Sequence, residues 1–273
     1  MTMDNQKLSA DNPPANEGEP LVSLEGAGIW YRLRSRRSAH LKTAFLQGGT
    51  RVGQDKFWAL RDIDLECREG QILGVVGRNG AGKSTLCMLL AQILTPDEGR
   101  ARIRGRVTPL LGLGNGFSQE MSGRDNVYLY GAFLGLNRAQ VEAQLPEIIE
   151  FSELGKFIDE PIYTYSPGMR ARLGFSVAAT IEPEIMILDE VLGVGDRRFR
   201  VKSKKRIMEL LETSKLIVIV SHSEKFLRDT CTHALWLEEG RVRAYGHAGE
   251  VLDAYSSESD LAGGDQSPRP VRG

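Results

Sequence analysis

Short apolar segments, separated by charged and glycine-rich stretches, recur along the chain and predict its strands. Segments of about 4–8 residues with such boundaries are typical of buried strands. They lie at residues 21–24, 29–31, 57–60, 63–65, 72–76, 185–188, 216–220, 234–237 and 242–245, and residues 101–107 alternate as a further strand. Residues 83–94 have helical character instead, and Pro96 and Gly99 end that helix.

Residues 123–182 interrupt this strand pattern. Apolar side chains recur there near helical spacing, at Leu129, Phe133, Leu136, Val141, Leu145, Ile148 and Ile149. The pattern predicts a helical subdomain at about 121–182, inserted into an α/β domain that spans residues 21–255. Both ends are rich in polar residues and proline, so we expect a disordered leader at 1–20 and a flexible tail at 256–273.

The composition favours a cytoplasmic location and argues against nucleic acid as a partner. Lys and Arg number 35 and Asp and Glu 36, and a net charge of −1 argues against a protein held on nucleic acid by its overall positive field. No apolar run approaches the ~20 residues that span a bilayer, and the polar N-terminus is not a secretory signal. Three scattered cysteines fit a reducing compartment. We therefore expect a cytoplasmic protein that binds no nucleic acid.

One segment departs from this balance of charge. Residues 26–54 contain no Asp or Glu, but they carry Arg32, Arg34, Arg36, Arg37, Lys42 and Arg51. Two interpretations stay open for it, a solvated loop and a surface that faces anionic lipid headgroups or an anionic substrate.

The strongest motif follows the predicted strand at 72–76. It matches G-x-x-x-x-G-K-[ST] and consists of Gly77, Arg78, Asn79, Gly80, Ala81, Gly82, Lys83, Ser84 and Thr85. Its glycines let several backbone N–H groups point at one anion, and the following helix adds its positive end. We expect this P-loop (77–85) to bind the phosphates of ATP, with Lys83 at the β- and γ-phosphates and Ser84 as a ligand of Mg²⁺.

Two later strands end in residues suited to the same site. The strand at 185–188 leads into Asp189 and Glu190, and the strand at 216–220 leads to His222. Ligands of open α/β sheets bind beyond the carboxyl ends of the strands. We expect Asp189 to hold Mg²⁺, Glu190 to act as the catalytic base on the attacking water, and His222 to contact the γ-phosphate.

A capped helix start lies 23 residues before Asp189. Ser166 suits the N-cap position and Pro167 the first helical position, and Gly168 follows. Local chemistry alone accepts this segment as an ordinary helix start.

The P-loop, this Ser-x-Gly segment, the Asp-Glu strand and the histidine, in this order, resemble an ABC-type ATPase domain over roughly residues 21–250. The resemblance implies an α/β P-loop NTPase fold with a RecA-like core, an antiparallel β subdomain and an inserted helical subdomain. It also implies a homodimer with two ATP molecules at its interface. The chain has no Asn-Lys-x-Asp motif, which argues against a GTPase.

The resemblance also assigns roles to single residues. Ser166 and Gly168 would contact the γ-phosphate held by the other subunit, and Val194-Gly195-Asp196 resembles the loop that links the two sites. Tyr31 aligns best with the aromatic residue that stacks on adenine, and Trp58 is the second candidate. Both aromatic residues also fit a purely structural place in the core.

Several segments resemble one branch of the family, the ATP-binding subunits of bacterial polysaccharide exporters. These are 110–117, 122–126, 148–154, 165–175 and 188–196. That branch implies a separate integral-membrane permease dimer, a lipid-linked polysaccharide as the exported substrate, and a peripheral place on the cytoplasmic face of the cell membrane.

The sequence departs from the usual family pattern at two places. Residues 111–114 lack the common glutamine, with Gln119 out of register, and Pro167 and Met169 replace common signature residues. Two alternative functions are a soluble ABC ATPase without a membrane partner and a small-molecule P-loop kinase. A soluble ABC ATPase without a membrane partner usually carries two cassettes or a long coiled coil, and a small-molecule P-loop kinase would need an acceptor-binding lid. The sequence shows none of these three features.

Overall fold

The computed structural model describes residues 19–32, 56–110, 114, 116–189 and 195–263. Its larger sheet has the strand order β5-β6-β7-β3-β8-β9. The strands are β3 (Gln71–Val76), β5 (Val107–Leu110), β6 (Ile185–Asp189), β7 (Leu216–Val220), β8 (His233–Glu238) and β9 (Arg241–His247). All neighbours pair in parallel except β8 and β9, which are antiparallel. The α/β fold class is therefore confirmed.

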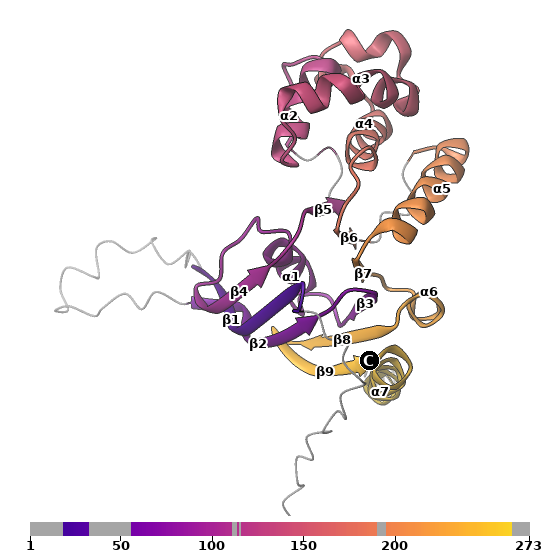
Figure 1. Ribbon diagram of the computed structural model, residues 1–273. Helices are drawn as coiled ribbons and strands as arrows, with labels where there is room; N and C mark the ends of the chain where they lie inside the picture. Colours follow the sequence, from indigo (N-terminus) through magenta and orange to yellow (C-terminus); the bar gives the residue numbers. More distant parts are fainter. Residues whose placement is uncertain (1–18, 33–55, 111–113, 115, 190–194, 264–273) are drawn as a thin grey trace, which may run out of the picture.

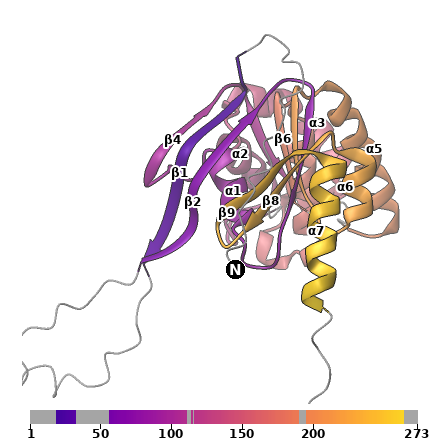
Figure 2. The same cartoon turned by 90° about the horizontal axis from the view of Figure 1, so that it is seen from below.

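A second, antiparallel sheet has the order β2-β1-β4. It consists of β1 (Val22–Arg32), β2 (Lys56–Cys67) and β4 (Glu98–Ile103). Figure 2 shows this sheet on one side of the molecule and three helices on the other, which are α5 (Arg197–Thr213), α6 (Glu224–Thr230) and α7 (Ala248–Gly263). The antiparallel subdomain expected from the sequence is thus present.

Alternation along the central strands explains how the larger sheet separates two apolar cores. Ile185 and Ile187 of β6 lie in the core shared with β1 and β2, whereas Met186 and Leu188 lie in the core shared with the helices. The strand β7 divides in the same way. A strand that is buried on both faces needs a continuous apolar run, which is why these strands stand out in the sequence.

The helices are α1 (Lys83–Leu90), α2 (Gly123–Phe133), α3 (Arg138–Ser152), α4 (Pro167–Ala179), α5 (Arg197–Thr213), α6 (Glu224–Thr230) and α7 (Ala248–Gly263). Short 3₁₀ turns follow α3 at Gly155–Asp159 and Ile162–Thr164. Figure 1 shows α2, α3 and α4 grouped in a lobe apart from α1 and the small sheet. Among the described residues, no helix has both the length and the apolar character to cross a membrane.

Three expectations about elements were wrong. Residues 101–107 do not form one strand, because the chain turns at Gly105 (φ 106°) and passes from β4 in the small sheet to β5 in the large one. The first helix ends at Leu90, four residues early, and Gln92 then adopts a φ of 58°.

The predicted tail at 256–273 is also wrong in its first part, since α7 continues to Gly263. Tertiary contacts hold this helix: the ring of Tyr255 meets Trp236 edge to face, and the Ser256 hydroxyl donates to the Glu224 carboxylate. Residues 1–18, 33–55 and 264–273, which include most of the basic segment, lie outside the described residues.

Candidate nucleotide-binding site

The P-loop joins β3 to α1, and its glycines are required by both space and backbone conformation. Gly77 has a φ of 148°, and a Cβ placed on it would lie 2.3 Å from the Leu237 carbonyl oxygen. Gly82 has a φ of 104°, and a Cβ there would lie 2.6 Å from the Ala59 carbonyl oxygen. Any side chain at either position would push the loop away from β2 and β8.

The loop is closed by its own lysine. Lys83 Nζ donates to the carbonyl oxygens of Gly77 at 2.6 Å and Arg78 at 3.1 Å, and its side chain is buried. Arg78, Gly80 and Ser84 are exposed on the outer side of the turn. The arrangement places one cation at the centre of the loop and leaves the outer backbone accessible.

The first turn of α1 is suited to an anion. Helices α2 to α6 begin with a Ser, Asn or Asp side chain that accepts from a first-turn amide. In α1 the N-cap is Gly82, which has no side chain to do this, and the first turn carries no acidic residue. The α1 amides and the positive end of the helix therefore fit a phosphate group.

The turn between β8 and β9 contacts the P-loop by a hydrogen bond, which the sequence analysis did not predict. Gly240, between β8 and β9, donates its N–H to the Ala81 carbonyl at 3.1 Å and accepts from the Arg61 N–H at 2.8 Å. A Cβ on Gly240 would lie 2.7 Å from the Ala59 carbonyl oxygen. The contact of this turn with the P-loop depends on the tertiary fold, because Gly240 and Ala81 are far apart in the sequence.

The parallel register brings the other predicted residues to the same edge of the sheet. Asp189 pairs with Val220, and Val220 pairs with Val75, so the ends of β6, β7 and β3 are level. His222 follows two residues after Val220 and is exposed. Glu190 lies outside the described residues, one position beyond the end of β6.

The Ser-x-Gly segment forms an accessible helix start, away from the P-loop. Ser166 Oγ accepts from the Met169 N–H at 3.2 Å, with Pro167 at the first helical position. Ser166 and Pro167 are exposed, and a Cβ placed on Gly168 would meet only Ser166 Oγ, at 3.8 Å. In Figure 1, α4 belongs to the helical lobe and α1 does not. The exposed helix start is thus available to another molecule.

The start of α5 carries the described part of the predicted linking loop. Asp196 caps this helix by accepting from the Phe199 N–H at 2.9 Å. That backbone hydrogen bond, together with nearby Arg172 and Arg198, lowers the pKa of the Asp196 carboxyl group. Val194 of this loop lies outside the described residues.

The segment that lacks the common glutamine is described only in part, because residues 111–113 lie outside the described residues. Gln119, which follows it, accepts a hydrogen bond at Oε1 from Arg170 of α4 at 3.5 Å.

A family model described as ABC transporter matches residues 60–193. An O-antigen export system ATP-binding protein from Klebsiella pneumoniae is 44% identical over 200 residues, covering 73% of this chain and 81% of that protein. The chain belongs to the ABC transporter family. The similarity to O-antigen and teichoic acids export proteins confirms the resemblance to the polysaccharide-exporter branch.

Further ABC proteins support the assignment. A teichoic acids export ATP-binding protein from Lactococcus lactis is 40% identical over 225 residues, covering 82% of this chain and 48% of that protein. The chain spans about half the length of the first curated relatives that it matches. A solved ATP-binding subunit of an ABC transporter aligns with a TM-score of 0.62 at 19% identity, over 86% of this chain and 93% of that one, which shows the same fold.

The structure places the two candidates for an adenine-stacking residue on opposite faces of the small sheet. Tyr31 pairs with Phe57 across β1 and β2, and both are exposed, at 41% and 49%. Ile29, two residues before Tyr31 on β1, pairs with Leu60, so Tyr31 and Phe57 share the face of Leu60. Leu60 Cδ2 would lie 2.9 Å from a Cβ built on Gly82. Trp58 lies on the opposite face, where its ring covers Gly28. Phe57, which the sequence interpretation did not consider, is therefore a second aromatic residue on the P-loop side.

We expect Tyr31→Ala to raise the KM for ATP about fivefold, because an aromatic stacking contact is worth about 1 kcal/mol. Phe57→Ala is expected to act in the same direction. Trp58→Ala should lower the melting temperature and leave KM within about twofold, because Trp58 packs on the other face. Steady-state phosphate release at varied ATP checks all three variants. A larger KM effect for Trp58 than for Tyr31 would reverse the assignment.

Proposed function

We propose that this chain is the ATP-hydrolysing subunit of an ABC exporter that drives a lipid-linked polysaccharide across the cytoplasmic membrane. It would act as a homodimer bound to a separate membrane permease. The observation that carries the proposal is the exposed, serine-capped start of α4, which lies apart from the P-loop of the same chain. In an ABC-type homodimer, this helix start would face the nucleotide held by the other subunit.

The P-loop fits the triphosphate of ATP. The loop combines glycines without room for a side chain, an α1 N-terminus without a capping side chain, and the buried Lys83. Lys83 would exchange its loop carbonyls for phosphate oxygens, while the α1 amides would hold the phosphates by hydrogen bonds. Tyr31 and Phe57 would contact the adenine.

Bound Mg²⁺ supplies positive charge to the phosphate oxygens, and Ser84 and Asp189 are the residues that would hold it. Glu190 would accept a proton from the attacking water, and His222 would donate a hydrogen bond to the γ-phosphate. The strands β3, β6 and β7 end at the same level, and this supports the assignment. Their ends bring the P-loop, Asp189 and the segment that carries His222 to one edge of the sheet.

A second copy of the chain would complete each site. Ser166 and Gly168 of one subunit would contact the γ-phosphate held by the P-loop of the other. Pro167 has no N–H and the Met169 N–H donates to Ser166 Oγ, so the Ser166 hydroxyl and the Gly168 N–H would be the groups that contact an anion. The positive end of α4 favours this contact, since its first turn carries no acidic residue. Two ATP molecules would then be needed to hold the dimer closed.

The relatives support the substrate class. The names of the similar proteins from Klebsiella pneumoniae and Lactococcus lactis assign them to O-antigen export and teichoic acids export. A permease in the membrane would provide the path for the polysaccharide. This chain would supply the energy through closure of the dimer and its reopening after hydrolysis.

The proposal is tested in the source cell by replacing the gene with a Lys83→Ala copy. We expect the surface polysaccharide to be lost and its lipid-linked precursor to accumulate inside, while tagged wild-type protein co-purifies with a permease from detergent-solubilised membranes. An unchanged cell surface, together with recovery of the protein only from the soluble fraction, would contradict the exporter assignment.

A further inference from the structure

Two cations on α5 bind the C-terminal ends of two helices of the lobe. Lys202 Nζ donates to the Phe151 carbonyl of α3 at 3.0 Å, and Arg206 Nε donates to the Ala179 carbonyl of α4 at 2.9 Å. The last carbonyls of a helix lack partners within the helix and carry its negative dipole end, so a cation there is favourable. Lys202 and Arg206 are one helical turn apart and reach these two ends from the same side of α5.

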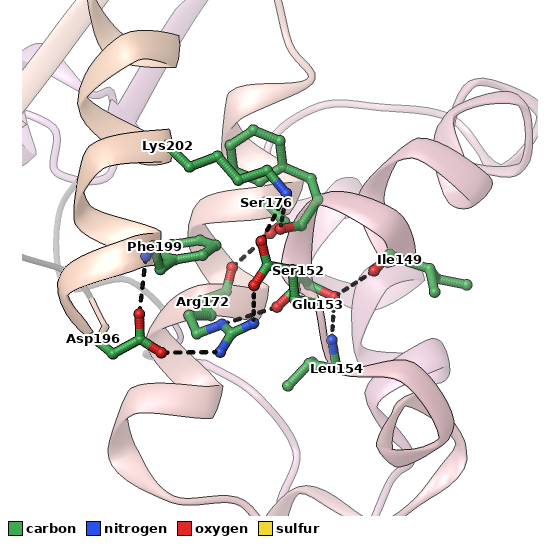
Figure 3. A network of polar contacts seen from close by, with 10 residues as sticks. Ile149, Ser152, Glu153, Leu154, Arg172, Ser176, Asp196, Phe199 and Lys202 are labelled. Carbon is green, nitrogen blue, oxygen red and sulfur yellow. Dashed lines mark hydrogen bonds and ion pairs between the residues drawn. The ribbon is translucent and has the colours of Figure 1, made fainter.

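Glu153 connects the same cation to the α4 helix. It is the C-cap of α3 in a left-handed conformation, with a φ of 53°. One carboxylate oxygen lies 3.2 Å from Lys202 Nζ and the other 3.3 Å from Arg172 Nη2 of α4, as Figure 3 shows. Arg172 Nε also donates to the Ser152 carbonyl at 2.9 Å. These side chains are only 15–34% exposed, so water screens their interactions less than those of a surface pair.

An apolar base lies at this three-helix junction. Phe151 of α3, Phe175 of α4 and Phe199 of α5 contact one another, with ring centroids 5.8–6.0 Å apart. Each helix contributes one ring. Phe175 and Phe199 are fully buried, so this cluster stabilises the junction in addition to the ionic contacts.

The junction connects two parts of the proposed site. Ser166 is the N-cap of α4, and Gly168 lies in the first turn of that helix. Asp196 is the N-cap of α5 and follows the segment that carries Glu190. Arg172 lies between them, with Nη1 3.8 Å from the Asp196 carboxylate and its guanidinium 5.0 Å from the Phe199 ring. The network in Figure 3 thus runs from the Ser-x-Gly helix to the helix that follows the catalytic strand.

We infer that Lys202, Arg206 and Glu153, called the α5 clamp, are positioning residues for ATP hydrolysis, an inference that rests on the proposed function. The clamp fixes the Ser-x-Gly helix of a subunit relative to that subunit's own β6–α5 segment. When two copies close, each subunit would present Ser166 to the nucleotide held by its partner and Glu190 to the nucleotide held at its own P-loop. The clamp would make these two placements occur together. Without the clamp, each subunit would still bind ATP at its P-loop. The dimer would then close with the Ser-x-Gly helix misplaced relative to the β6–α5 segment.

The test compares Lys202→Met with Lys204→Met. Both substitutions remove one ammonium group from α5 and keep an unbranched side chain, but Lys204 is exposed and forms no ion pair with a described carboxylate. For Lys202→Met we expect kcat to fall about tenfold and the KM for ATP to change less than twofold, because misplacing a remote positioning element costs rate more than binding. Lys204→Met should match the wild type in both.

Further variants separate orientation from folding. Lys202→Arg should recover at least half of kcat, since a guanidinium can still donate to Phe151 and Glu153. Glu153→Gln should show the same kcat loss, and adding it to Lys202→Met should lower kcat by less than the product of the two single effects. If Lys202→Met does not fold, Glu153→Gln and Lys202→Arg carry the test.

The outcomes distinguish the inference from the function on which it rests. A wild-type protein that does not hydrolyse ATP would overturn the proposed function. A wild type that does, combined with an unchanged kcat in Lys202→Met, or an equal loss in Lys204→Met, would overturn the clamp alone. A rise in KM that accounts for the whole effect would also overturn it, because the clamp does not touch the P-loop.

Discussion

Lys83→Ala is expected to lower the rate of ATP hydrolysis at least about 100-fold and to remove measurable ATP binding at micromolar concentrations. The substitution takes away the cation proposed for the β- and γ-phosphates. It also removes the two hydrogen bonds, at 2.6 and 3.1 Å, that close the loop onto Gly77 and Arg78. Phosphate release and binding of a fluorescent ATP analogue measure the two effects.

Lys204→Ala on α5 is the matched control, because Lys204 is exposed and belongs to no part of the proposed site. It should leave both measurements at the wild-type value. Lys83→Arg separates charge from loop closure: it keeps the charge, but the buried position leaves little room for a longer side chain. Full ATP affinity in Lys83→Ala would contradict the phosphate cradle.

Glu190→Gln is expected to lower kcat about 10²- to 10⁴-fold and to leave ATP affinity within about twofold. Glutamine keeps the shape of the side chain but cannot accept the proton of the attacking water. The bound ATP therefore persists, and we expect the variant to accumulate as a dimer with ATP and Mg²⁺. Single-turnover kinetics and size-exclusion chromatography with light scattering measure these effects.

Glu212→Gln, an exposed position on α5, provides the control for loss of one carboxylate. It should hydrolyse ATP at the wild-type rate. If Glu190→Gln keeps its turnover, another group serves as the base. If it loses turnover but stays monomeric with ATP and Mg²⁺ bound, the proposed dimer is wrong while the assignment of Glu190 survives.

The candidate site was predictable where chemistry is local in sequence. The P-loop needs glycines and a lysine at fixed spacing, and the strand before it and the helix after it gave the context. Parallel strands between two cores read as continuous apolar runs, so the ends that carry Asp189 and His222 were also visible. The exposed Ser166 cap followed the same local rule.

Other features were not predictable because they depend on contacts between distant segments. The choice between Tyr31 and Trp58 needed the register of β1 and β2, which is irregular between Ile29 and Trp30. The extension of α7 to Gly263 needed Trp236 as a partner for Tyr255. No sequence pattern links Gly240 to Ala81.

The sequence by itself determined that this chain is an ABC ATPase domain, because phosphate binding demands specific residue types at fixed spacing along one short loop. Only the tertiary structure decided three other features. These are which aromatic side chains share the face of the small sheet that contacts the P-loop, which turn forms a hydrogen bond with that loop, and how α5 contacts the ends of α3 and α4. Those features arise from strand register and from the caps of helix ends, where side chains far apart in the chain meet. A single sequence does not record such pairings, since each partner residue is locally ordinary.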